Sequence, residues 1–177
     1  KKLSKKDKKK QSKMLIKSRK LYKKGIYYNR KPVKSFKSTK SPHVITAMKI
    51  YKVDKIQPDS NLARATGCSK CALKKIVNKG QGAYFSSGSR PNQTAQSWGI
   101  ARLASSITGG KAAAVDYSIL LEGCKPKSKA LTMAKKAKKK IGRATRKTKL
   151  MWISLFIFHY LYFIIYELIH NPSYRYN

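Results

Sequence analysis

Residues 91–110, PNQTAQSWGIARLASSITGG, carry a clear helical pattern. Ile100, Leu103, Ala104 and Ile107 recur at spacings of three and four residues, which places them on one face of a helix. A proline in the first turn and a glycine pair after the last apolar residue are typical helix boundaries. We therefore predict an amphipathic helix that begins near the proline and ends at the glycine pair.

The same helical pattern occurs on both sides of this stretch. On the C-terminal side, Ala112, Val115 and Ile119 predict a second helix up to Gly123, so the glycine pair would join a helical hairpin. On the N-terminal side, another apolar face ends at Gly80; it consists of Ala72, Leu73, Ile76 and Val77. Residues 41–124 should thus form a small, mostly helical domain.

Residues 43–56 are ambiguous. The run VITAMKIYKV suits a strand, whereas Ser41-Pro42 before it also suits a helix start. We expect an extended segment here.

The charge of the chain limits its function. Lys and Arg number 42 and Asp and Glu six, a formal net charge of +36 that calls for an acidic or polyanionic partner. Residues 1–40 hold 18 basic residues and one acid, with little apolar surface. We expect them to form an extended basic arm, disordered in isolation.

Residues 125–149 form a second basic segment, with an apolar stripe at Ala130, Ala134, Ala137 and Ile141. We predict a basic amphipathic stalk helix whose cations contact acidic lipid headgroups, with nucleic-acid phosphate or plain solvation as alternatives. The predicted contacts are Lys135, Lys136, Lys138, Lys139, Lys140, Arg143, Arg146, Lys147 and Lys149.

Residues 150–169, LMWISLFIFHYLYFIIYELI, are long and apolar enough for a C-terminal transmembrane helix, with residues 170–177 as a short tail. The alternative is a buried core helix. The predicted spanning residues are Leu150, Trp152, Phe156, Phe158, Leu161, Phe163, Ile165 and Leu168. The basic flank would place residues 1–149 on the cytoplasmic side. The expected fold class is mainly α, with an extended arm, a helical domain and this span.

Chemical signatures are poor. Ser86, Ser87 and Ser89 have no triad spacing to a histidine, and SITGGKA lacks the first glycine of a P-loop. We expect no enzyme, cofactor or metal. Cys68 and Cys71 form CxxC; we expect reduced thiols, with a zinc site completed by His43 as the alternative.

Trp98 and Arg102 lie one turn apart, on the side of the predicted helix away from its apolar stripe. We interpret them, with Arg90, as a possible protein interface, because Trp and Arg are frequent interface anchors. Packing of Trp98 and Arg102 against the preceding loop, residues 79–93, is the competing interpretation, and we favour it over an interface.

Residues 79–110, above all SSGSRPNQTAQSWGIARLAS at 86–105, resemble a small domain found in large icosahedral DNA viruses of the chlorovirus type. The resemblance implies a virion structural protein, with no catalytic residues to transfer. We expect a minor capsid protein at the interface of capsid and inner membrane, associated with host cytoplasmic membranes during assembly. Its partners would be major and minor capsid proteins and the bilayer, without a small-molecule substrate. The alternative is a membrane-tethered nucleic-acid-binding or ribonucleoprotein component.

Overall fold

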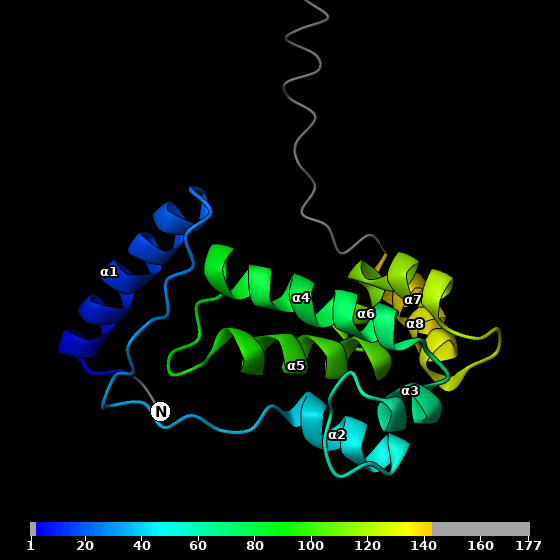
Figure 1. The fold of residues 1–177 in the computed structure, drawn as a ribbon. Helices are drawn as coiled ribbons and strands as arrows, with labels where there is room; N and C mark the ends of the chain where they lie inside the picture. Colours follow the sequence, from blue (N-terminus) through cyan, green and yellow to red (C-terminus); the bar gives the residue numbers. More distant parts are fainter. Residues whose placement is uncertain (1–2, 143–177) are drawn as a thin grey trace, which may run out of the picture. The chain divides into compact units, whose positions relative to one another are not determined.

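The computed structural model describes residues 3–142, in which the chain is mainly helical and contains no strand. Within this range, eight helices follow one another (Figure 1). They are α1 (Lys5–Tyr22), α2 (Pro42–Tyr51), α3 (Ser60–Thr66), α4 (Lys70–Ser86), α5 (Ala95–Ile107), α6 (Lys111–Val115), α7 (Tyr117–Gly123) and α8 (Lys129–Ile141).

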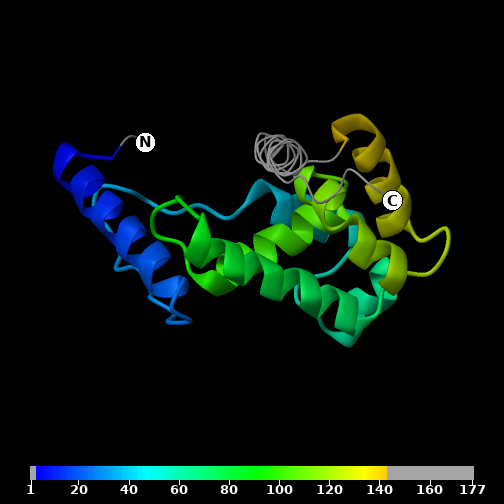
Figure 2. The same cartoon turned by 90° about the horizontal axis from the view of Figure 1, so that it is seen from above.

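The pair α4 and α5 forms the centre, and the two helices lie side by side in both views (Figures 1 and 2). Their backbones approach closely at two glycines: a Cβ on Gly80 would lie 2.7 Å from the Cα of Gly99, and one on Gly99 would lie 2.8 Å from the carbonyl oxygen of Val77. This requirement explains why α4 runs on through Gly80 to Ser86, whereas the sequence predicted a helix end at Gly80.

The boundaries of α5 are set by its caps. The hydroxyl of Thr94 accepts a hydrogen bond from the Ser97 backbone, and the Ser97 hydroxyl accepts one from the Thr94 backbone, so the helix begins at Ala95. The predicted start near Pro91 was four residues early. The predicted apolar face is confirmed, because Leu103, Ala104 and Ile107 are fully buried.

The prediction of an extended segment at residues 43–56 is wrong, because most of it lies in helix α2. Pro42 occupies the first turn of α2, and Val44, Ala47 and Tyr51 are buried at helical spacings. The Tyr51 hydroxyl donates a 2.6 Å hydrogen bond to the carbonyl oxygen of Ile107, which ties α2 to the end of α5.

The single helix predicted between Gly110 and Gly123 is interrupted. It forms as α6 and α7, which are separated at Asp116. The Asp116 side chain is fully buried and bound by groups of α4 and α5. The helix is therefore interrupted at the residue whose side chain these groups hold.

The prediction that residues 1–40 form an extended basic arm is wrong for α1. Ser4 caps this helix, and the helix packs on the C-terminal half of α4. Gln11, Met14 and Ser18 are its buried face. The Ser18 hydroxyl donates a 3.2 Å hydrogen bond to the carbonyl oxygen of Phe85, so a polar side chain helps to hold α1 on α4.

The segment between α1 and α2 is fixed by Asn92, at the start of the α5 region. Its side chain accepts a 2.8 Å hydrogen bond from the Val33 backbone and donates a 2.9 Å bond to the Val33 carbonyl oxygen. The guanidinium of Arg30 lies 3.8 Å from the centroid of the Tyr84 ring. Residues 26–40 are therefore held against the α4–α5 pair.

The predicted stalk helix is present as α8, and it packs against α6 and α7. Ala130, Ala134 and Ala137 of its predicted stripe are buried, together with Leu131, whereas Ile141 of that stripe is exposed. Its lysines consequently face outward.

The transmembrane helix in the expected fold class is also corrected. Within residues 3–142, no helix combines the length and the apolar composition that crossing a bilayer requires, so a fold with a transmembrane helix is not supported. The predicted span at residues 150–169 lies outside the described residues.

Candidate polyanion-binding surfaces

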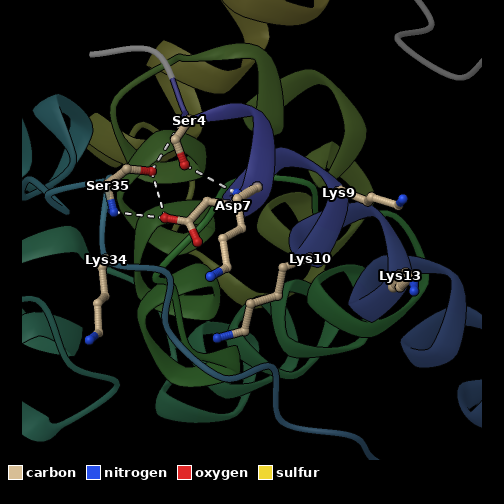
Figure 3. Close-up of a pocket in the computed structure, with 8 residues that line it drawn as sticks. Ser4, Asp7, Lys9, Lys10, Lys13, Lys34 and Ser35 are labelled. Carbon is tan, nitrogen blue, oxygen red and sulfur yellow. Dashed lines mark hydrogen bonds between the residues drawn. The ribbon is translucent and has the colours of Figure 1, made fainter.

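A hollow lies between the N-terminal half of α1 and the segment around Ser35 (Figure 3). We call it the lysine groove. It measures about 900 Å³ and is lined by Ser4, Lys6, Asp7, Lys9, Lys10, Lys13, Lys34 and Ser35. Five of these eight residues are lysines, so the groove has the chemistry of an anion-binding surface.

Asp7, the one acid in the lysine groove, is engaged in holding its two walls together. Its carboxylate accepts a 2.6 Å hydrogen bond from the Ser35 hydroxyl and a 2.9 Å bond from the Ser35 backbone (Figure 3). These bonds lower the pKa of Asp7, with help from the charges of Lys10 and Lys6. The carboxylate thereby fixes Lys34 opposite the lysines of α1.

The lysines of the groove follow helical spacing. Lys6, Lys9, Lys10 and Lys13 stand at i, i+3, i+4 and i+7, which places them along one side of α1. Within residues 3–142, salt bridges involve only Lys79 and Arg102, both with Asp116. None of the five groove lysines therefore forms a salt bridge within the described residues, and Asp7, whose pKa Lys10 and Lys6 lower, is the acid near them.

The outer face of α8 is the second lysine-rich surface. Lys135, Lys136, Lys138, Lys139 and Lys140 are all exposed, as a headgroup or phosphate contact requires. One of them also covers an aromatic ring of the domain: the Lys138 amine lies 4.1 Å from the centroid of the Tyr117 ring. The other predicted contacts, Arg143, Arg146, Lys147 and Lys149, lie outside the described residues, as do all the predicted spanning residues.

The three residues predicted as a protein interface come together in one pocket. Trp98, Arg102 and Arg90 line a hollow of about 340 Å³ between α2, α5 and the start of α6, which we call the arginine pocket. Its other lining residues are Thr39, Ser41, His43, Gln93, Ala101, Ser105, Lys111 and Ala112. No acid of residues 3–142 is among them.

Asp116 holds the side chain of Arg102 in place. Its Nε and Nη2 atoms donate hydrogen bonds of 2.8 and 2.7 Å to the two carboxylate oxygens of Asp116. The Lys79 amine lies 3.0 Å from the same carboxylate, and the Ser106 hydroxyl donates a 2.9 Å bond to it. This paired geometry fixes the plane of the guanidinium.

The fully buried carboxylate of Asp116 remains ionised because of these partners. Burial by itself would raise its pKa, but the hydrogen bonds and charge of Arg102, with the bonds from Lys79 and Ser106, lower the pKa below its usual value. Two cations, Lys79 and Arg102, pair with one carboxylate, so the cluster next to the arginine pocket has a net positive charge.

Sequence reasoning did not identify Asp116, Lys111 or His43 as parts of this site. Asp116 carried a signal, since it is a lone acid within the apolar run AAAVDYSIL. Lys111 and His43 carried none, because only the packing of α2 and α6 beside α5 brings them to the pocket.

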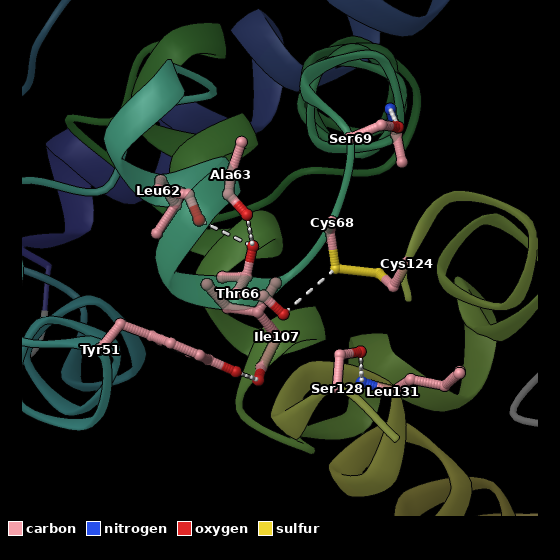
Figure 4. The surroundings of a disulfide bond; sticks show 11 residues. Tyr51, Leu62, Ala63, Thr66, Cys68, Ser69, Ile107, Cys124, Ser128 and Leu131 are labelled. Carbon is pink, nitrogen blue, oxygen red and sulfur yellow. Dashed lines mark hydrogen bonds between the residues drawn. A yellow bond between two sulfur atoms is a disulfide. The ribbon is translucent and has the colours of Figure 1, made fainter. Parts of the chain in front are cut away.

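The expectation of reduced thiols was also wrong. Cys68 forms a disulfide with Cys124, and an isolated antiparallel bridge between these two residues brings their backbones together (Figure 4). Cys71 is an exposed free cysteine. The bond removes Cys68 from the zinc site considered above, and residues 3–142 contain no cluster of three or more potential metal ligands.

These features define a disulfide-linked helical domain whose exposed surfaces are rich in lysine. The chain belongs to the family of unknown function DUF5824, which it matches over residues 1–122. The match extends from α1 into α7, so the basic N-terminal helix lies within the family region and α8 lies beyond it. No curated protein and no solved structure matches the chain.

Proposed function

We propose that this protein is a structural component of a virion, a minor capsid protein that binds acidic surfaces of neighbouring capsid proteins through its lysine groove. The observation that carries the proposal is that five lysines line the groove beside a single acid, Asp7, and that none of them forms a salt bridge within residues 3–142. A rigid lysine surface of this kind gains most when an acidic partner supplies the missing charge. The virion setting is supported by the viral resemblance of residues 86–105.

The α8 lysines extend this proposal to the inner membrane. They stand on one exposed face of a helix whose other face is buried, and each lysine near an anionic membrane surface contributes about 1 kcal/mol. The protein would then lie between capsid proteins and acidic lipid headgroups. We propose a binding role without catalysis, since the buried carboxylate of Asp116 is occupied by three donors.

Carbodiimide cross-linking of purified virions tests the proposal, because this reagent joins a lysine amine to a carboxylate in direct contact. We expect cross-links from Lys9, Lys10 and Lys13 to acidic residues of capsid proteins, identified by mass spectrometry. Lys70, Lys74 and Lys75 on α4 are exposed too and serve as internal controls. Absence of the protein from purified particles, or cross-links from the control lysines alone, would refute the proposal.

A nucleic-acid role is the second candidate, and the regular spacing of the α1 lysines favours it. A phosphate backbone could follow the row Lys6, Lys9, Lys10 and Lys13. Each lysine that contacts a phosphate of duplex DNA contributes about 0.9 to the slope of log affinity against log salt. If the triple change of Lys9, Lys10 and Lys13 to Gln lowers that slope and the same change of Lys70, Lys74 and Lys75 does not, the groove binds nucleic acid.

A further inference from the structure

The arginine pocket has cationic groups that the domain itself does not neutralise. Arg90 and Lys111 line it from two different elements, and neither forms a salt bridge within residues 3–142. Both residues are exposed, so their side chains remain available to a ligand. The lysine groove shares none of the lining residues of this pocket.

Arg102 adds a cation that is already oriented. Asp116 accepts hydrogen bonds from Nε and Nη2, which leaves the Nη1 donors of the guanidinium outside this pair. The Arg102 side chain is only 18% exposed, so little rotamer freedom remains to be lost when a ligand binds. A pre-ordered arginine of this kind suits an oxyanion with several acceptor atoms.

The remaining lining residues supply polar groups of the right kind. Ser41 precedes α2 without capping it through its side chain, and Thr39 provides a second hydroxyl beside it. Trp98 gives the pocket one aromatic residue. Hydroxyl and guanidinium donors around a volume of about 340 Å³ match an anionic group with a small organic substituent.

We propose that the arginine pocket binds a phosphate group, either as free phosphate or as the phosphate of a mononucleotide. Arg90 and Lys111 bind its charge, Arg102 donates through Nη1, and Asp116 acts as a positioning residue that holds Arg102. Phosphate fits better than a carboxylate because Arg90 and Lys111, the two lining cations without a salt bridge in the described residues, can balance its two charges while Arg102 supplies a further donor. This inference is independent of the partner of the lysine groove.

Fluorescence titration of the full chain tests the inference. The chain has two tryptophans, so a Trp152→Phe background leaves Trp98 in the pocket as the reporter. Inorganic phosphate, adenosine monophosphate and adenosine are added at constant ionic strength. We expect saturable binding of phosphate, the monophosphate or both, and no saturation with adenosine. Saturation by inorganic phosphate indicates a free-phosphate site, and saturation by the monophosphate alone indicates a nucleotide site.

A double variant supplies the decisive comparison. Arg90→Gln with Lys111→Gln should weaken binding at least about tenfold, as expected when two charged hydrogen-bond donors are lost. Lys74→Gln with Lys75→Gln removes the same charge from exposed positions on α4 and should leave affinity unchanged. Equal weakening in both variants, saturation by adenosine, or no saturation by any probe would overturn the inference. The groove variants of the preceding section are expected to bind the phosphate probes normally.

Discussion

Asp116 illustrates how one acid organises a domain that is almost entirely basic. It is the fully buried carboxylate of the described residues, and it connects α4, α5 and the break between α6 and α7. Removing one partner of a buried ion pair leaves the other charge without compensation, which costs more than the pair contributes. The cluster thus couples the core of the domain to the base of the arginine pocket.

We predict that Asp116→Asn destabilises the domain by about 3 kcal/mol, because Arg102 and Lys79 lose their carboxylate. Urea unfolding followed by circular dichroism measures the change. Asp54→Asn, a change at an exposed acid, should alter the free energy of unfolding by less than about 0.5 kcal/mol. Equal effects of the two substitutions would contradict the role of the cluster.

The lowered pKa of Asp116 predicts a pH dependence with a definite sign. The folded carboxylate binds a proton less readily than the unfolded one, so its contribution is complete above the unfolded pKa near 3.8 and is lost as the pH falls below it. Thermal unfolding from pH 7 to pH 2 should show a falling midpoint at the acidic end. Asp116→Asn should show a shallower fall, and Asp7, whose pKa is also lowered, contributes with the same sign.

Close packing at Gly99 predicts a second effect of a single residue. Gly99→Ala would place a Cβ 2.8 Å from a backbone oxygen of α4, which cannot move aside alone, and we expect a loss of about 1–3 kcal/mol. Gly82→Ala is the matched control, because its Cβ would meet the Tyr22 hydroxyl, the far end of a side chain rather than a backbone atom, at 2.9 Å. The control should be clearly milder in chemical denaturation. A Gly99→Ala domain as stable as the control would argue against the close crossing.

Among the helices, α1 contacts the rest of the domain through a narrow row of buried side chains. Met14 is 7% exposed, whereas Ile16 on the same helix is 63% exposed. We predict that Met14→Ala lowers stability by about 2 kcal/mol and increases hydrogen exchange within α1, while Ile16→Ala changes neither measurably. Unchanged exchange in the Met14 variant would show that α1 is held by its polar bonds instead.

The apolar periodicity of the sequence predicts α5 and its buried face well, because Ile100, Leu103 and Ile107 decide both. It fails for α1, since the helix is docked by Ser18 and Gln11, whose polar side chains bond to carbonyl oxygens far along the chain. It also favoured a strand at α2, where β-branched residues outweighed the proline at the helix start. Long-range partners of this kind cannot be inferred from local spacing.

The candidate site divides in the same way. Trp98 and Arg102 were identified from their shared side of one helix, and that spacing survives in the structure. Lys111 and His43 come from other helices, so their convergence depends on tertiary packing. From the sequence, the lysine groove could be recognised only as a lysine-rich segment. Its shape depends on the hydrogen bonds between Asp7 and Ser35, which are 28 residues apart in the sequence.

At the scale of the molecule, the disulfide joins residues 56 apart in the sequence. A loop of that length restricts the unfolded chain by about 4 kcal/mol in the chain-entropy description. We predict that reduction, or Cys68→Ser with Cys124→Ser, lowers the free energy of unfolding by roughly that amount. Cys71→Ser should leave it unchanged because Cys71 is free and exposed. Equal stability with and without reductant would contradict a structural role of the bond.

The same bond has a consequence for proteolysis. The covalent ring closed by Cys68 and Cys124 contains α4 to α7, whereas α1 and α8 lie outside it at opposite ends. A single nick anywhere inside the ring, such as after Lys79, leaves both lysine-bearing helices on one molecule until a reductant is added. The two basic ends would therefore remain tethered to each other after damage to the connecting domain.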